Sequence, residues 1–114
     1  ATRVLIGPSL GGVITAYTAL RHPHVFGRAG SQSGSMFVSD YAILDALEGA
    51  EGSGLKLFVE TGIYENDVMP EANQRFVTAA RGVGLDVRFE EYPSTHDWIG
   101  WRNRLSTILR HLVL

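Results

Sequence analysis

The sequence predicts an α/β fold in which a parallel sheet is flanked by helices, and three observations predict it. Short apolar runs that end near glycine alternate along the chain with longer helix-compatible segments. The first run, at 4–6, is apolar without interruption, which is typical of a strand covered on both faces. The 114 residues are 45% hydrophobic and 19% charged, a composition that favours one packed core.

The first half of the chain predicts two strands, each followed by a helix. The run at 4–6 ends at Gly7, and small or apolar residues over 10–21 then predict a helix. Segment 26–35 is rich in glycine and serine around a short strand, and 41–50 has the pattern of a short amphipathic helix.

The second half continues the alternation. Turn-forming residues at 51–54 predict a loop, and 55–62 predicts a strand that ends at glycine. Segment 69–84 has proline in its first turn and glycines at its end, as helices often do. The polar and apolar residues of 85–93 alternate as in a strand, and 97–114 predicts a closing helix with one apolar side. The chain therefore predicts parallel strands joined by helical crossovers.

Composition excludes several classes of function. Ten basic and twelve acidic residues are spread evenly, so neither a nucleic acid nor a membrane surface is expected as a partner. The sequence has no cysteine, which excludes thiolate chemistry, and no cofactor or metal is expected. No apolar stretch approaches the roughly 20 residues of a membrane span. We expect a single domain over 1–114, cut at its N-terminal side, and a cytoplasmic location.

The stretch Gly7-Pro8-Ser9-Leu10-Gly11 contains the pattern G-x-S-x-G between the first strand and the first helix. In this pattern a sharp strand-to-helix turn exposes the serine, and the glycines allow the helix and backbone to approach closely. Phosphate-binding loops are excluded, because Gly12 replaces the required lysine and Ser9 a required glycine. Ser9 is therefore a candidate nucleophile; the alternative is a serine that only caps the helix.

A serine nucleophile needs a base, and His96 is the candidate. It lies between the last predicted strand and the last helix, where a side chain can reach over the carboxyl edge of the sheet. The alternative is an ordinary surface histidine. The other histidines, His22, His24 and His111, lie near helix ends and are interpreted as solvated cations.

The acid of such a triad follows the serine and precedes the histidine in the chain. Glu60, Glu65 and Asp67 stand at or after the second convincing strand. Glu60 is expected within the strand, whereas Glu65 and Asp67 lie on the loop after it, and either could orient the imidazole. The alternative is that both are solvated loop charges.

Four separated segments carry a resemblance to a known family: IGPSLGG, LRHPHVFGRAGSQSGS, ETGIYENDVMPEANQRF and STHDWIGWRNRL. Together they resemble the C-terminal half of an enterochelin-esterase-like α/β-hydrolase, a group that includes esterase-D-type feruloyl and acetyl esterases. The resemblance implies a partial α/β-hydrolase fold that lacks the N-terminal strands and the loop with a second oxyanion donor.

The resemblance also implies roles for individual residues. Ser9 would be the nucleophile and His96 the general base of ester hydrolysis through an acyl-enzyme. Glu65, three residues after the glycine that ends the strand, would be the acid, with Asp67 as the alternative. Leu10 would offer its backbone N–H to the oxyanion. The family's usual tryptophans after SQSGS are replaced by methionine and phenylalanine here, which leaves the substrate preference open.

The implied substrate is a siderophore ester of the enterochelin type, or an aryl or acetyl ester. Trp98 and Arg102 could contact an aromatic, anionic group by stacking and by charge. The alternative is that the helical spacing of Trp98 and Trp101 places both in the core. A rival function is a non-catalytic module, because an open sheet edge invites self-association or pairing with an N-terminal half.

Overall fold

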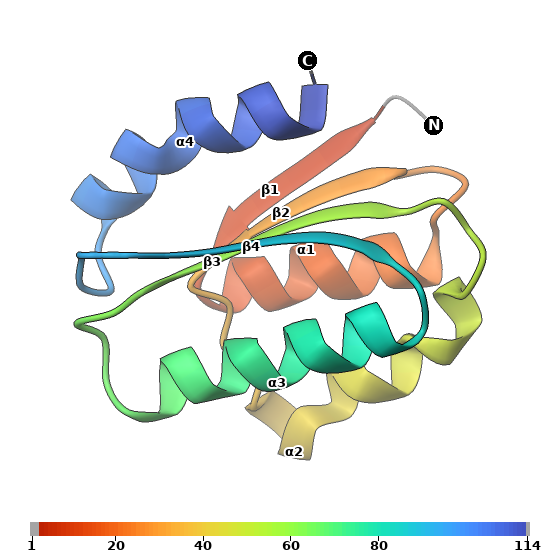
Figure 1. The fold of residues 1–114 in the computed structure, drawn as a ribbon, viewed down its shortest axis with the longest axis horizontal. Helices are drawn as coiled ribbons and strands as arrows, with labels where there is room; N and C mark the ends of the chain where they lie inside the picture. The colour runs from red at the N-terminus through yellow and green to blue at the C-terminus, as the bar shows by residue number, and fades with distance from the viewer. Residues whose placement is uncertain (1–2, 114) are drawn as a thin grey trace.

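The computed structural model describes residues 3–113 and contains one parallel sheet between two helical layers (Figure 1). The four strands follow their sequence order across the sheet, and every neighbouring pair is parallel. They are β1 (Val4–Pro8), β2 (Arg28–Gln32), β3 (Lys56–Gly62) and β4 (Asp86–Tyr92). The predicted fold class is therefore confirmed.

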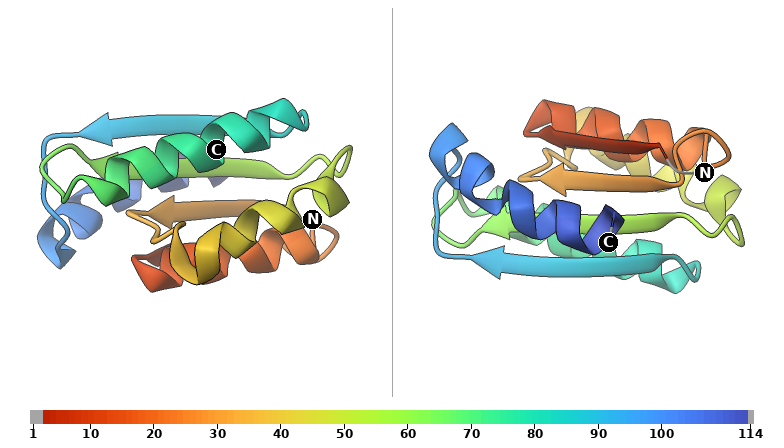
Figure 2. Two further views of the ribbon diagram at one scale, coloured as in Figure 1. Left: turned by 90° about the horizontal axis from the view of Figure 1, so that it is seen from below. Right: turned by 90° about the horizontal axis from the view of Figure 1, so that it is seen from above.

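The helices divide unequally between the two faces of the sheet. One face carries α1, α3 and the short helices between β2 and β3, whereas α4 lies alone on the other (Figures 1 and 2). Their bounds are α1 (Leu10–Arg21), α2 (Val38–Tyr41), η1 (Ala42–Ala46), η2 (Glu48–Ala50), α3 (Val68–Gly82) and α4 (Trp98–Val113).

The core has two parts because β3 is buried on both faces. Leu57 and Val59 join the large cluster under α1 and α3, and Phe58 points to the small cluster under α4. On β2, a Cβ at Gly30 would lie 2.8 Å from Ile108 of α4, so glycine is needed for this helix to approach the sheet. The position of α4, which follows the His96 loop, depends on this close packing.

The predicted helix at 41–50 is wrong in type. The structure has two short 3₁₀ turns there, in which the Leu47 and Ala50 N–H groups bond Leu44 and Leu47 carbonyls, three residues back. Three of the four residues of α2, 39–41, have left-handed backbone angles, so α2 is not a regular right-handed helix that could continue into this segment. The segment that remains is too short for a cooperative α-helix, and its apolar side packs on the core instead.

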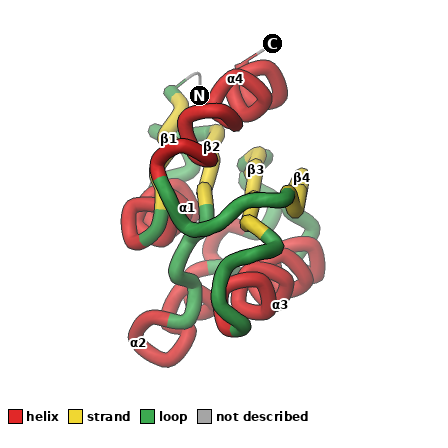
Figure 3. The backbone as a smooth tube through the Cα atoms, turned by 90° about the vertical axis from the view of Figure 1, so that its left-hand side faces the viewer, coloured by secondary structure: helices red, strands yellow, loops and turns green. Residues whose placement is uncertain are grey.

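Since all strands run in one direction, their carboxyl ends meet at one edge of the sheet, which faces the viewer in Figure 3. The loops after β1, β2, β3 and β4 carry Ser9, Ser33, Glu65 and His96 respectively. Within the described residues, no helix combines the length and apolar character that crossing a bilayer requires.

Candidate active site

Ser9 is the single residue between β1 and α1, and its backbone has the strained conformation of a sharp turn (φ 58°, ψ −124°). Its N–H donates to the Gln32 carbonyl at 2.8 Å, which ties the turn to β2. Its Oγ lies 2.9 Å from Nε2 of His96. Among the described residues the hydroxyl caps no helical N–H. The geometry is that of a half-buried serine at the tip of a sharp turn, not that of a helix-capping serine.

The glycines around Ser9 differ in how strictly they are required. A Cβ at Gly7 would lie 2.6 Å from the Gly11 carbonyl oxygen, and one at Gly12 would lie 2.6 Å from Ser31 Oγ. A Cβ at Gly11 would meet its nearest neighbour, Pro8 Cδ, at an ordinary 3.6 Å. The expectation that a motif glycine allows close approach is therefore correct for Gly7 and wrong for Gly11. The second close approach occurs at Gly12 instead.

His96 lies on the loop after β4, and its ring bridges Ser9 and Glu65. Nδ1 is 2.6 Å from Oε1 of Glu65, and Nε2 faces the Ser9 hydroxyl. The ring also meets the Trp101 indole edge-on, with centroids 4.8 Å apart and planes at 89°. The imidazole side chain is 37% exposed, so it is open to the surface on one side and fixed on the other.

The Glu65 side chain is fully buried, and hydrogen-bond donors surround both of its oxygens. Oε1 faces His96, and Oε2 accepts from the Gly62 N–H at 2.7 Å and from Ser33 Oγ at 2.5 Å. Thr61 Oγ1 lies at a longer 3.4 Å. No sequence spacing indicates the contact with Ser33, because 32 residues separate it from Glu65.

The other two candidate carboxylates do not reach His96. Asp67 is exposed just before α3 and, in the part of the chain described, makes no hydrogen bond to the imidazole. Glu60 lies in β3, as expected, with its side chain fully buried and paired to Arg104 at 2.9 Å. Burial raises the pKa of Glu60, and the Arg104 guanidinium opposes this. Arg104 also pairs with Glu90, and that contact lowers the pKa of Glu90.

Asp97, next to His96, was not a candidate from sequence, although an aspartate just before an apolar helix is a typical cap. Its Oδ1 accepts the N–H groups of Ile99 and Gly100 at 3.0 and 3.1 Å. The hydroxyl of Thr95 donates to Oδ2. The Thr95 bond, followed by the Gly100 N–H, holds the pKa of Asp97 below its ordinary value. Asp97 thereby joins the His96 loop to the start of α4.

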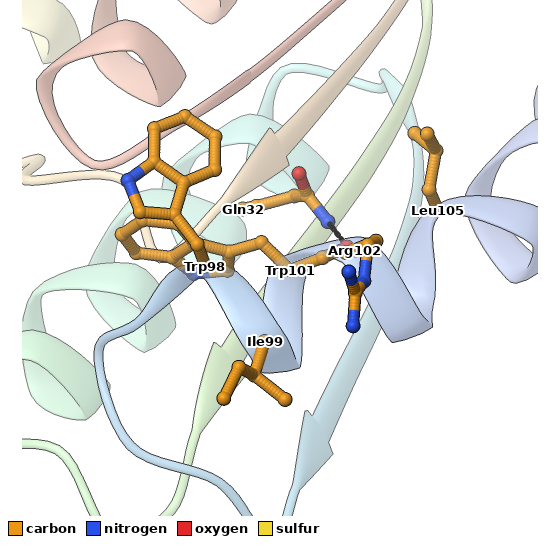
Figure 4. A pocket seen from close by; sticks show the side chains of 6 residues that line it. All are labelled: Gln32, Trp98, Ile99, Trp101, Arg102 and Leu105. Carbon is orange, nitrogen blue, oxygen red and sulfur yellow. Dashed lines mark hydrogen bonds between the residues drawn. The ribbon is translucent and has the colours of Figure 1, made fainter.

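The two predicted substrate-binding residues line a pocket of about 340 Å³ along α4 (Figure 4). Trp98 is 71% exposed, whereas Trp101 is buried at 6%, so the core interpretation of the tryptophans is right for Trp101 alone. The pocket adjoins the serine turn through two of its lining residues. The backbone carbonyl of Gln32 accepts a hydrogen bond from the Ser9 N–H, and Trp101 contacts His96. The full lining is Gln32, Trp98, Ile99, Trp101, Arg102 and Leu105.

The backbone N–H of Leu10 stands in the first turn of α1, where a helix has no internal acceptor for its N–H groups and carries a partial positive charge. An anion beside Ser9 could accept a hydrogen bond from the Leu10 N–H. A metal is not indicated by the side chains: across residues 3–113 no three histidine, aspartate or glutamate residues gather as a metal site.

The remaining histidines are remote from this site. His22 and His24 are exposed after α1, as expected. His111 is at the far end of α4, half-buried and edge-on to Phe58 with ring centroids 5.5 Å apart. Burial lowers the pKa of His111. The interpretation of His111 as a solvated cation is therefore wrong, because its ring packs on the sheet.

The chain is similar to known esterases over nearly its whole length. Residues 1–112 match the family model described as "Putative esterase". The iron(III) enterobactin esterase of Dickeya dadantii (strain 3937) is 32% identical over 127 residues, which cover 96% of this chain and 29% of that protein.

Solved structures agree. The enterochelin esterase from Shigella flexneri matches with a TM-score of 0.85 and 28% identity, over 98% of this chain and 32% of that one. The S-formylglutathione hydrolase FrmB from Staphylococcus aureus has the same fold, with a TM-score of 0.84 and 19% identity over 97% and 51% of the two chains. The four parallel strands and their helices thus match part of the α/β-hydrolase fold, and the chain spans between about a third and a half of these proteins.

The two motif glycines give a first prediction. Gly7→Ala should lower the free energy of unfolding by about 1–3 kcal/mol, because its Cβ meets backbone that cannot move aside. Gly11→Ala should be neutral or stabilise by up to about 1 kcal/mol, since alanine favours a helix and has room there. Urea unfolding of both variants measures the difference. Equal destabilisation by the two would contradict the prediction.

The Asp97 cap gives a pH-dependent prediction. Since its folded-state pKa lies below the unfolded value of about 3.9, the charged cap stabilises the fold above that pH and ceases to do so as the pH falls through the folded-state pKa. Asp97→Ala should lower Tm at neutral pH, and the gap to the wild type should close as the pH falls from about 5 toward 3. Asp97→Asn, which keeps an acceptor for the N–H groups of the helix, should lower Tm less than Asp97→Ala does. A gap that does not change with pH would count against this role.

Proposed function

The chain belongs to the esterase family that its residues 1–112 match, and on this premise we propose that it is a serine carboxylic ester hydrolase. Ser9 is the proposed nucleophile, His96 the general base and Glu65 the acid. The observation that carries the proposal is the continuous chain of contacts from Ser9 Oγ to His96 Nε2 at 2.9 Å and from His96 Nδ1 to Glu65 at 2.6 Å. Asp67 is set aside as the acid, because it is exposed away from the imidazole.

The geometry supports a two-step mechanism. The buried carboxylate of Glu65 accepts a hydrogen bond from the Nδ1–H of His96, so the lone pair of Nε2 faces the Ser9 hydroxyl. Ser9 Oγ attacks the ester carbonyl while Nε2 takes its proton, and Glu65 stabilises the imidazolium. The Leu10 N–H stabilises the oxyanion.

The tetrahedral intermediate then collapses as His96 protonates the leaving alcohol, and the acyl group remains on Ser9. Water enters, gives its proton to His96 and attacks the acyl-enzyme. A second tetrahedral intermediate breaks down as His96 returns this proton to Ser9 Oγ, which releases the carboxylic acid and restores the hydroxyl. The same base therefore serves both halves of the reaction.

The pocket beside Ser9 favours a substrate ester whose acyl part carries an aromatic ring and a negative charge. A catecholate siderophore is one such ester. The exposed indole of Trp98 meets Trp101 edge-on with centroids 5.2 Å apart, which leaves a face of Trp98 for stacking. Arg102 is exposed one helical turn further, where its guanidinium can pair with an anion. The iron(III) enterobactin esterase named above supports this substrate class over a simple acetyl ester.

The outer edge of β1 supports a macromolecular partner as well. β1 has no charged residue, whereas the other edge strand, β4, carries the four charges that usually protect an edge: Asp86, Arg88, Glu90 and Glu91. Beside β1, Leu10, Ile14 and Tyr17 of α1 are exposed. We infer that β1 pairs with a further strand, from another part of an esterase domain or from a second copy. If the site around Ser9 proves inert, this pairing surface supports the alternative of an assembly module.

Labelling with a fluorophosphonate, which reacts with activated serines, tests the nucleophile and base together. We expect the label on Ser9 alone by peptide mass spectrometry, none in Ser9→Ala, and a labelling rate about 10²- to 10⁴-fold lower in His96→Ala, since general-base help is lost. His24→Ala, which removes an exposed remote histidine, should label as the wild type does. Absence of label in the folded wild-type chain, or label at another serine, would refute the proposal.

Kinetics with two esters test the substrate class. Arg102→Met should raise KM about 2- to 5-fold for an aryl ester with a negative charge, as for an exposed charge pair, and leave a neutral acetyl ester unchanged. Trp98→Ala should raise KM for aryl esters of either charge. Arg110→Met, an exposed arginine further along α4, is the matched control and should change neither. A uniform effect of Arg102→Met on both esters would argue against charge recognition.

A further inference from the structure

We propose that Ser33 is a positioning residue that holds the carboxylate of Glu65 against His96, and that the indole N–H of Trp101 orients the Ser33 hydroxyl for this task. The inference deepens the function proposed above and rests on it. It concerns two residues that neither attack the substrate nor transfer a proton, but connect the proposed acid and base into one closed arrangement.

Ser33 occupies an unusual position at the end of β2. It is fully buried, and its φ of 51° is in the left-handed region that residues other than glycine rarely adopt. Its N–H donates to the Glu60 carbonyl at 2.9 Å, which fixes the backbone to β3. A serine kept in a conformation that suits glycine indicates that the hydroxyl itself has a role.

The direction of the hydrogen bonds at this hydroxyl follows from chemistry. An indole N–H can only donate, and Trp101 Nε1 lies 3.0 Å from Ser33 Oγ. A hydroxyl has a single proton, and Oε2 of Glu65 lies 2.5 Å away. Trp101 therefore donates to Ser33 and Ser33 donates to Glu65, so the hydroxyl proton points at the carboxylate.

These contacts close a ring of four side chains. Trp101 also meets the His96 ring edge-on at 4.8 Å, and His96 in turn bonds Glu65. The backbone of Trp101 is itself held, because its carbonyl accepts Gln32 Nε2 at 2.8 Å. A single indole thus contacts the base directly and reaches the acid through Ser33.

Other donors to Glu65 cannot replace Ser33. Gly62 and Thr61 also approach Oε2, but they belong to the end of β3 that leads directly into the Glu65 loop. A shift of that loop would carry these donors with it. Ser33 directly follows the neighbouring strand β2, so it is the side-chain donor that holds Glu65 in register with β2 and with the serine turn.

The test uses Ser33→Gly, which removes the hydroxyl while suiting the left-handed backbone, and Ser33→Ala as a second variant. Ser31→Ala is the matched control, because Ser31 Oγ is buried two residues earlier, in β2, and, within residues 3–113, has no hydrogen-bond partner. Circular dichroism and urea unfolding select variants that are folded. Trp101→Phe removes the indole N–H but keeps a ring beside His96.

The decisive readout is the tautomer of His96 from the nitrogen-15 NMR shifts of its ring, which does not need enzymatic activity. The wild type and Ser31→Ala should hold the proton on Nδ1, whereas Ser33→Gly should show a mixture of both tautomers, with a smaller effect in Trp101→Phe. With an aryl ester, Ser33→Gly should lower kcat about 10- to 100-fold and leave KM unchanged, as expected when catalytic groups are slightly displaced.

A folded Ser33→Gly with the wild-type tautomer and the wild-type kcat would overturn the positioning role. A wild type in which His96 already carries its proton on Nε2 would also overturn it. If the wild type hydrolyses no ester but Ser33→Gly alters the tautomer, the positioning role stands and the proposed function fails. The two proposals can therefore be judged separately.

Discussion

The parallel alignment of the four strands is the constraint on which the candidate site depends. It brings the carboxyl ends of all strands to one edge, so Ser9 and His96, 87 residues apart, lie within hydrogen-bond distance. The register then determines the details, because the Ser9 N–H bonds the carbonyl of Gln32 at the end of β2. A shift of β1 along β2 would move the serine away from the imidazole.

The helix α4 determines where the loop of His96, the proposed base, lies. It is alone on its face of the sheet, with Ile108 and Leu112 packed on Phe58. Two polar contacts also fix the orientation of α4 on the sheet. The Trp101 carbonyl accepts a hydrogen bond from Gln32, and Arg104 pairs with the buried Glu60. Such a buried ion pair adds little net stability once its loss of hydration is counted, but it favours one placement of the helix. The loop of His96 is therefore held by the helix that follows it.

Much of the fold could be predicted because its causes are local. Apolar runs, glycine ends and helical spacing indicated the strands and three of the helices correctly, and the turn around Ser9 could be recognised from its glycines. Segment 41–50 was mistaken because left-handed residues before it and packing against the core decide its geometry, and neither is visible in an amphipathic pattern. Similarly, Gly11 matches the motif, whereas the close approach occurs at Gly12.

The sequence by itself determined the class of fold, the strand-to-helix turn of Ser9 and the loop positions of His96 and of the two candidate acids, since these follow from short-range patterns. Only the tertiary structure showed that Glu65, and not Asp67, contacts His96, because two carboxylates on one loop differ only in the direction of their side chains. It alone showed that Ser33 contacts Glu65 and that Trp101 contacts Ser33. Their hydrogen bonds join residues 32 and 68 positions apart, and such contacts exist only after the strands have paired and α4 has packed.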